Sequence, residues 1–82
     1  MPFVVDAIQA GSPYQQKFDY DGRTDGQPVY VGWADPGVDT SEAKWRIFKM
    51  TYSGSNVTAV QFAGGSIRFN KVWDSRTTYV YS

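Results

Sequence analysis

Apolar and polar residues alternate with a period of two along residues 44–52, a pattern typical of β-strands. The apolar side chains fall on both faces of this strand: Trp45 and Ile47 on one, and Phe48, Met50 and Tyr52 on the other. A strand that is apolar on both faces needs cover on both. We therefore expect residues 44–52 to be the central strand, sandwiched within the domain or half-buried against another chain. A bulge at residues 48–49 would instead turn its second half inward.

Two tight turns connect this strand to further strands. Residues 53–56 and the pair Gly64-Gly65 are hairpin signals. Residues 57–63 are therefore expected to return as a strand, and residues 66–70 to form the next one. In these strands Val60 and Phe62 are in phase, Ile67 and Phe69 point inward, and Arg68 and Asn70 point outward.

The N-terminal half predicts two shorter strands, residues 14–20 and 27–34, separated by a turn-rich segment with two Asp-Gly pairs. In the second strand Val29, Val31 and Trp33 point to one side, and Tyr30 and Gly32 to the other. Residues 35–41 are rich in turn-forming residues and indicate an exposed loop.

The C-terminal part predicts a bend at residues 71–76, which carries Trp73, and a last strand at residues 77–81. The whole chain, residues 1–82, is expected to form one all-β domain: a small antiparallel β-sandwich or partly open β-barrel of five to six strands. Residues 1–13 favour an N-terminal arm that covers the edge of its own domain or docks on a neighbour.

Length and composition suggest that this domain associates with other molecules. A chain of 82 residues buries only about 60–65% of the surface that its unfolded form exposes. It has no cysteine, so no disulfide or thiolate metal site adds stability, but it has 5 Phe, 6 Tyr and 3 Trp. Its eight basic and eight acidic residues cancel, which gives little repulsion between copies. We therefore expect a homo-oligomer or symmetric assembly.

Charge and hydropathy also argue against two kinds of partner. A net charge of zero does not favour a strong, non-specific phosphate-binding surface, so we expect no nucleic acid. No apolar run approaches the length that spans a bilayer, so we expect no membrane association. The opening residues lack the basic region of a secretory signal, which indicates synthesis in a cytoplasm.

The residue types favour a protein without enzymatic activity and without a cofactor. The chain has no histidine and no cysteine, which are the usual general base near neutral pH and the usual thiol nucleophile. Hydrolysis would need a pair of carboxylates, and nothing in the sequence places two of them across a cleft. The carboxylates available for such a pair are Asp35, Asp39, Glu42 and Asp74.

Three binding sites remain as alternatives. Asp19, Asp21 and Asp25 resemble part of a calcium loop, although the glycine and glutamate expected at its sixth and twelfth positions are missing, and a hairpin turn explains the same residues. Basic residues around Trp73 and Phe69 could bind single-stranded nucleic acid, or Trp73 could plug one end of the barrel while Arg76 pairs with Asp74 or an interface carboxylate. Finally, an aromatic platform for a sugar could form from Tyr14, Tyr30 and Trp33 beside Asp35.

From Val29 onward the chain resembles a group of short structural proteins encoded by tailed bacteriophages. The resemblance covers roughly 50 of the 82 residues, and its most distinctive part is the closing V-W-D-x-R. The matching segments are Tyr30-Val31-Gly32, a small-residue loop at 36–43, Trp45-Arg46-Ile47, Lys49-Met50-Thr51-Tyr52 and Val72-Trp73-Asp74-Ser75-Arg76.

The resemblance implies a small, non-enzymatic component of the virion, assembled in the host cytoplasm and associated with the tail or the head-to-tail region. Its partners would be other virion proteins, bound by packing and by pairing of edge strands. Two further possibilities are a capsid decoration protein and a stand-alone β module that binds glycans or peptides. The expected interface residues are Trp33, Phe48, Tyr79 and Tyr81, with Arg46 and Arg76 fixing the register through ion pairs.

Overall fold

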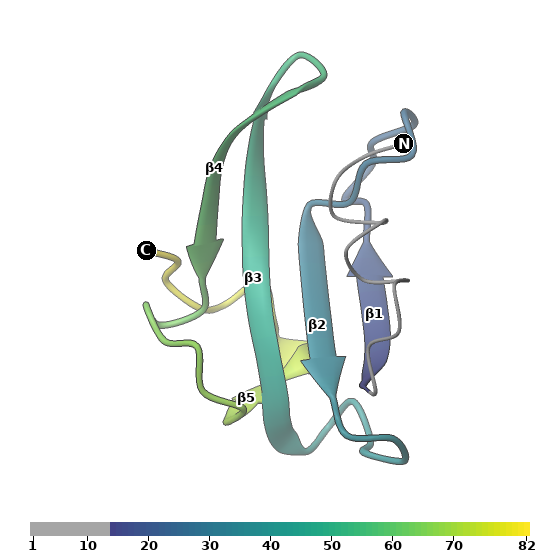
Figure 1. Cartoon of the computed structure of the whole chain (residues 1–82), viewed down its shortest axis with the longest axis vertical. Coiled ribbons are helices and arrows are strands. Elements are labelled where there is room, and N and C mark those ends of the chain that lie inside the picture. The colour runs from purple at the N-terminus through teal and green to yellow at the C-terminus, as the bar shows by residue number, and fades with distance from the viewer. Residues whose placement is uncertain (1–13) are drawn as a thin grey trace.

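The computed structural model describes residues 14–82 and confirms an all-β fold, an antiparallel sheet of five strands that does not close into a barrel (Figure 1). The strands are β1 (Gln15–Asp19), β2 (Tyr30–Ala34), β3 (Ala43–Ser53), β4 (Asn56–Phe62) and β5 (Lys71–Val72). A short 3-10 helix, η1 (Trp73–Ser75), follows β5. Residues 1–13, with the predicted N-terminal arm, lie outside the described residues.

The long strand β3 is the centre of the sheet, as its two apolar faces predict. The strand order is β1-β2-β3-β4, and β5 pairs with the start of β3. On one edge β3 pairs with β2. On its other edge, its second half pairs with β4 and its first three residues pair with β5. One strand of 11 residues therefore contacts three others, and its side chains are buried on both faces.

The two faces of the sheet carry separate apolar clusters. We call the side that carries Trp45 and Ile47 the back face, and the side that carries Phe48 and Met50 the front face. The back cluster includes Trp45, which is fully buried and lies 5.9 Å from Trp73 between ring centroids. Figure 1 shows β5 and the C-terminal segment passing behind the sheet on this side. β5 and the segment that follows it therefore form the second layer of the domain.

The front cluster is built from aromatic rings of neighbouring strands. Phe48 lies at its centre, with ring centroids 5.8 Å from Trp33 and 5.6 Å from Phe62. The buried members are Val31, Phe48 and Met50, with Phe18, Trp33, Tyr52 and Phe62 packed against them. The predicted division between two faces is confirmed for the β3 side chains and for Tyr30, Val31 and Trp33 of β2. Val29, expected to share a face with Val31, instead packs against the back cluster, because it precedes the first residue of β2.

The segments after residue 63 differ from the prediction. Residues 66–70 form no strand, and Ile67, expected to point inward, is 60% exposed. The reason lies in the ladder next to β4: Phe62 exchanges backbone hydrogen bonds with Ser82, so the C-terminal end of the chain occupies the place that residues 66–70 would need. The loop is instead stabilised locally by a bond from the Arg68 N–H to the Ser66 hydroxyl.

Two other expectations near the C-terminus are wrong. The predicted strand at residues 77–81 contributes only one bridge, between Ala63 and Tyr81. Residues 76–78 instead turn, with backbone bonds from Arg76 to Trp73 and from Thr78 to Ser75. The expected bend at residues 71–76 begins with the short strand β5, because its backbone finds partners on β3.

The bulge also lies elsewhere than at residues 48–49. The register between β3 and β4 shifts at Thr51 and Tyr52, where Thr51 faces Ala59 and Tyr52 faces Val57. The extra residue is therefore Thr58 on β4. Because one extra residue reverses the alternation of side chains, this bulge changes which β4 residues share a face.

Arg76 fixes the C-terminal segment to β1 through an ion pair with Asp19. Its Nε lies 2.8 Å from the carboxylate, 57 residues earlier in the chain. The expected partners, Asp74 or a carboxylate of another chain, are not the ones found. The Trp73 ring packs under the guanidinium, 4.7 Å from its Cζ. The other carboxylate oxygen of Asp19 accepts a bond from the Asp21 N–H.

This ion pair predicts a dependence of stability on pH. Burial raises the pKa of Asp19, but hydrogen bonds from Arg76 and from the Asp21 backbone, with the Arg76 charge, outweigh it, so that the pKa lies below 3.8. A carboxyl group whose pKa is lowered by folding stabilises the folded state at pH values above its unfolded-state pKa. This stabilisation is lost as the pH falls through its folded-state pKa. Asp19→Asn is expected to lower the free energy of unfolding at pH 7 by about 1–2 kcal/mol.

Denaturant titrations between pH 7 and pH 2 would check this prediction. The difference between wild type and Asp19→Asn should shrink on acidification. Asp74→Asn is the matched control, since the Asp74 side chain is exposed and makes no ion pair among the described residues. A constant difference at all pH values would contradict the assigned role of the Asp19 charge.

Candidate interaction surface

The front face continues beyond the buried cluster onto β4, the last strand of the sheet. In the register of β3 and β4, Phe62 lies opposite Phe48, Val60 opposite Met50 and Val57 opposite Tyr52. Residues that lie opposite each other in an antiparallel pair share a face. Without the bulge at Thr58, Val57 would lie on the back face, because it is an odd number of residues from Val60. The bulge thus places three apolar side chains of β4 in one row.

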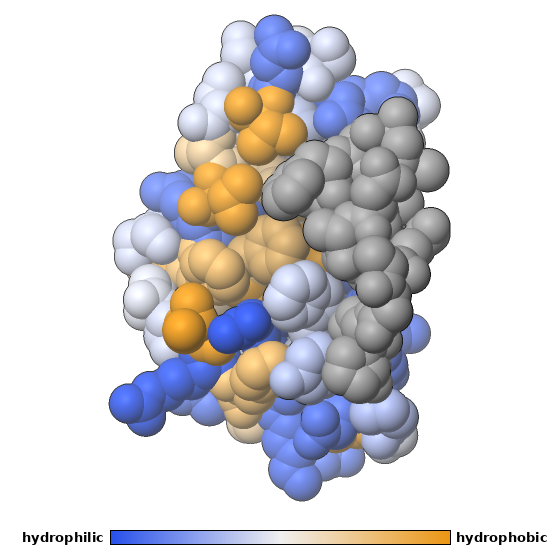
Figure 2. Space-filling model, viewed as in Figure 1, coloured by the Kyte–Doolittle hydropathy of each residue, from blue (hydrophilic) through white to orange (hydrophobic). Residues whose placement is uncertain are grey.

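The outer part of this row is open to solvent. Val57 is 46% exposed and Val60 49% exposed, and Ile67 follows at 60%. Figure 2 shows apolar side chains gathering on this side of the molecule, over β3 and β4. Single apolar residues on a surface are ordinary, but several on one face of a small domain indicate an interaction site. We call Val57, Val60, Phe62 and Ile67 the apolar strip.

An arginine closes one end of the apolar strip. Arg46, opposite Trp33 in the register of β2 and β3, donates from Nε to the Ile67 carbonyl at 2.7 Å. Its Cζ lies 4.9 Å from the Phe69 ring and 5.7 Å from the Trp33 ring. No carboxylate among residues 14–82 pairs with it. Arg46 therefore holds the 66–70 loop against the front face and leaves positive charge beside the apolar strip.

Trp33 contributes a second polar group at this end. Its indole Nε1 is buried and has no hydrogen-bond partner among the described residues. Its ring is stacked with Tyr14, with an angle of 8° between the planes and 6.5 Å between centroids. Tyr14 in turn lies 5.1 Å from Phe69. The aromatic rings here are thus packed on one another.

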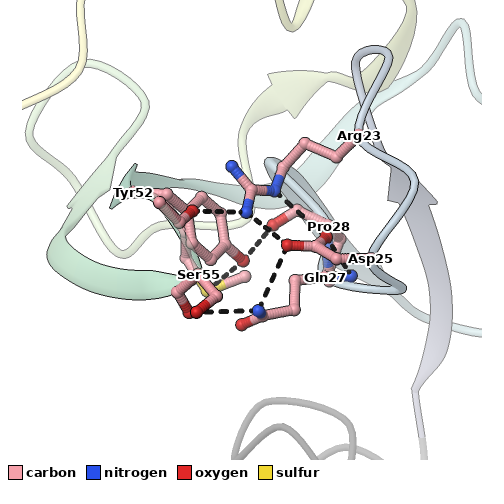
Figure 3. Close-up of polar contacts among 8 residues, drawn as sticks. Arg23, Asp25, Gln27, Pro28, Tyr52 and Ser55 are labelled. Atoms are coloured by element: carbon pink, nitrogen blue, oxygen red, sulfur yellow. Dashed lines mark hydrogen bonds and ion pairs between the residues drawn. The ribbon is translucent and has the colours of Figure 1, made fainter.

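The other end of the front face is held by the loop between β1 and β2. Arg23 pairs with Asp25, donates to the Gly54 carbonyl at 2.8 Å and lies 3.8 Å above the Tyr52 ring (Figure 3). The Tyr52 hydroxyl donates to the Pro28 carbonyl at 2.6 Å. Burial raises the pKa of Tyr52, and the hydrogen bond from Arg23 lowers the pKa of Asp25. These contacts tie the β3–β4 turn to the sheet and fix the start of β4.

The residues predicted to form an interface take different places. Phe48 is 7% exposed and Trp33 is partly buried, so the reason for choosing Phe48, an apolar side chain on an outward face, does not hold. Tyr79 and Tyr81 pack against the back cluster. Their hydroxyls bond inside the chain, Tyr79 accepting from the Val72 N–H and Tyr81 donating to the Arg76 carbonyl. Burial raises the pKa of Tyr81.

The two arginines chosen for ion pairs are also placed apart. Arg76 pairs with Asp19 behind the sheet, whereas Arg46 lies at the end of the apolar strip. Of the six predicted interface residues, Trp33 and Arg46 therefore border the exposed apolar surface. Sequence reasoning missed Val57 and Ile67 as exposed residues. The uncharged run of β4 was a usable signal for an open strand, but the phase change at Thr58 cannot be read from the alternation.

The calcium alternative finds no support in the geometry. Asp19 is bonded to Arg76 and to the Asp21 N–H, and Asp25 is paired with Arg23. Across residues 14–82, no three acidic side chains are grouped so that they could hold a metal ion.

The other two alternatives are divided by the fold. Trp73 is buried, and Arg76 is engaged with Asp19, so they do not present a stacking platform for nucleic acid. In the proposed sugar platform, Tyr30 lies in the back cluster and Trp33 in the front cluster. The separation follows from their odd spacing on one strand.

Comparisons with known proteins give no relative from which a function could be transferred. No family model matches the chain, and neither a curated protein nor a solved structure is similar to it. Within the described part of the chain, no helix has the length and apolar character needed to cross a bilayer.

Proposed function

We propose that this protein is a non-enzymatic structural component of a tailed-bacteriophage virion, present in several copies, which binds other virion proteins of the tail or the head-to-tail region through the front face of its sheet. The resemblance of the segments from Tyr30-Val31-Gly32 to the V-W-D-x-R ending supports the bacteriophage assignment. A net charge of zero is compatible with dense packing of many copies.

The observation that carries the proposal is the apolar strip. Val57 and Val60 are exposed on the same face that holds the front cluster, and Ile67 is exposed on the loop that Arg46 holds beside it. Covering them on assembly removes apolar surface from water, which contributes roughly 25 cal/mol per Å². Arg46 at the end of the strip would form a partly desolvated ion pair with a carboxylate of the partner. Such a pair determines the orientation of the two proteins more than it raises their affinity.

The tail assignment has two alternatives within binding proteins. A capsid decoration protein would use the same apolar strip on a different part of the particle. A stand-alone module would bind glycans or peptides, with the rings of Trp33, Tyr14 and Phe69 as its contact surface. That the rings pack on one another speaks against the stand-alone module.

The direct test is quantitative mass spectrometry of purified particles of the phage that encodes this protein. We expect the protein in a fixed, multi-copy ratio to the major tail or neck proteins. Its absence from intact particles would overturn the proposal. A ratio matching the major capsid protein would support the decoration alternative.

Two binding measurements separate the other classes. Titration calorimetry against host surface polysaccharides should give no heat for an assembly protein, and saturable heat for a glycan-binding module. A single-strand nucleic-acid binder should be retained on a polyanion column in a salt-dependent way. We expect this protein to pass through the polyanion column without being retained, even at low salt.

A further inference from the structure

The outer edge of β4 has unused backbone hydrogen-bonding groups at defined positions. The Phe62 N–H points away from β3, because it donates to the Ser82 carbonyl at 3.0 Å, and Phe62 accepts from the Ser82 N–H at 3.2 Å. Backbone groups alternate between the two edges of a strand, so Val60 also directs its N–H and C=O outward. Val57 faces Tyr52, which is an even number of residues from Phe48 and Met50 on β3. The backbone N–H and C=O of Val57 therefore also point outward, away from β3.

These two positions have no backbone partner among residues 14–82. The C-terminal end of the chain pairs with Phe62 and Gly64, and β4 pairs otherwise only with β3. Figure 1 shows β4 at the margin of the sheet, with the C-terminus beside the end of the strand. The open stretch of edge therefore runs from Asn56 to Gln61.

The open edge lacks most of the devices that prevent strands from pairing between molecules. Natural edges are protected by charged residues, especially lysine, by proline, by bulges or by a covering segment. β4 contains no charged residue and no proline along its seven residues NVTAVQF, and its one bulge is at Thr58. Two of its exposed side chains, Val57 and Val60, are apolar and lie on one face. An uncharged edge meets an identical edge without repulsion.

The spacing of the open positions matches a second copy of the same strand. In a two-fold arrangement, residue i of one strand faces residue j of the other, and j faces i. With the axis between Thr58 and Ala59, Val57 faces Val60 of the second copy, and Val60 faces its Val57. Both open positions of each strand then meet open positions of the other. In this register Phe62, which already bonds with Ser82, faces Ser55 in the turn before the second copy's β4, so no residue of the second β4 strand competes for that position.

We propose that two copies of this chain associate through their β4 edges, antiparallel and with Val57 opposite Val60, to form one continuous sheet. The proposal deepens the multi-copy role proposed above, and it names the surface through which the copies meet. The joined sheet places two apolar strips side by side on one face. A larger apolar face is thereby offered to the next component of the assembly.

Light scattering after size-exclusion chromatography tests the association. We expect wild type to form a dimer. In Val60→Lys and in Val57→Lys, the dissociation constant of this dimer should rise at least about tenfold, which is a loss of about 1.4 kcal/mol of binding free energy. Val80→Lys is the matched control: Val80 is 80% exposed and lies off this edge, so its dimer should be unchanged. Circular dichroism of each variant verifies that it is folded. A wild type that stays monomeric at millimolar concentration would overturn the inference.

Single-cysteine variants test the register, because the chain has no cysteine of its own. A mixture of Val57→Cys and Val60→Cys should form a disulfide-linked dimer several-fold faster than either variant alone. Faster linkage of Val60→Cys with itself would contradict the register. Ile67→Lys distinguishes edge pairing from stacking of front faces, since only stacking should be weakened by a charge at that position.

The two proposals can fail separately. A monomer that is nevertheless found in particles at a fixed ratio would contradict β4 pairing and leave the structural role intact. A dimer linked at positions 57 and 60 but absent from particles would support β4 pairing and contradict the structural role.

A variant that lacks residues 1–13 should be measured in the same light-scattering series. If only this variant dimerises, the edge is covered within the full chain and the inference is wrong.

Discussion

Replacing Trp45 by alanine is expected to lower the free energy of unfolding by about 3–5 kcal/mol, the largest effect of any single substitution in this chain. Trp45 is fully buried on the strand that contacts three others, and its ring lies 5.9 Å from that of Trp73. Truncation would leave a cavity between the sheet and the C-terminal segment, and it would also remove the bond from the indole Nε1 to the Asp39 carbonyl. A domain of this size has a total stability of roughly 4–12 kcal/mol, so the variant should be marginally folded or unfolded at 37 °C.

Urea or thermal denaturation followed by circular dichroism measures this effect. Trp45→Phe serves as the graded comparison, since it keeps a ring in the core and removes only the indole N–H and part of the volume. Val80→Ala, at an exposed position, should change stability by less than about 0.5 kcal/mol. A loss below 1 kcal/mol in Trp45→Ala would contradict the two-layer arrangement on the back face.

Replacing Gly32 by alanine is expected to have the second-largest effect, although it adds only one methyl group. A Cβ at this position would lie 2.5 Å from Cε3 and 2.8 Å from Cζ3 of Trp73, and 3.1 Å from Cε3 of Trp45. Overpacking of a core costs about 1–3 kcal/mol and occasionally more, and two rigid indoles place this site at the upper end. We expect a fall in Tm of roughly 4–8 °C for each kcal/mol lost.

The matched control for this prediction is Gly37→Ala. There a Cβ meets nothing within 4 Å, and the φ of +89° predicts a modest backbone cost of about 1 kcal/mol. A double-mutant cycle identifies the cause: Trp73→Phe, which removes the ring atoms in question, should cost less in the Gly32→Ala background than in wild type. Additive effects would show that the contact with Trp73 is not responsible.

The candidate interaction surface was only partly predictable. The alternation in residues 44–52 correctly predicts which side chains of β3 share a face. It does not say which of the two faces the rest of the chain covers. The aromatic residues chosen as interface residues, Phe48, Tyr79 and Tyr81 among them, were the ones that the domain uses to fill its own interior. In a chain this short, large rings are the main source of core volume, so aromatic content is a poor guide to exposure.

The residues that are exposed are smaller and lie at the margin of the sheet. Val57 and Val60 are open because β4 has no further strand beside it, and Ile67 because residues 66–70 do not pair. Both facts follow from the path of the C-terminal segment, which bonds to Phe62 and Gly64. These contacts join residues about 20 positions apart, and the local pattern of the chain carries no information about them.

The sequence by itself determined the class of fold and its central strand, because period-two alternation and turn residues act locally and β3 is apolar on both faces. Only the tertiary structure decided which apolar residues stay outside. The Arg76–Asp19 ion pair and the pairing of Ser82 with Phe62 join segments that are far apart in the chain, and the bulge at Thr58 depends on the register that β4 takes on β3. They set the phase of β4 and the open part of its edge, and thereby the surface that remains available to a partner.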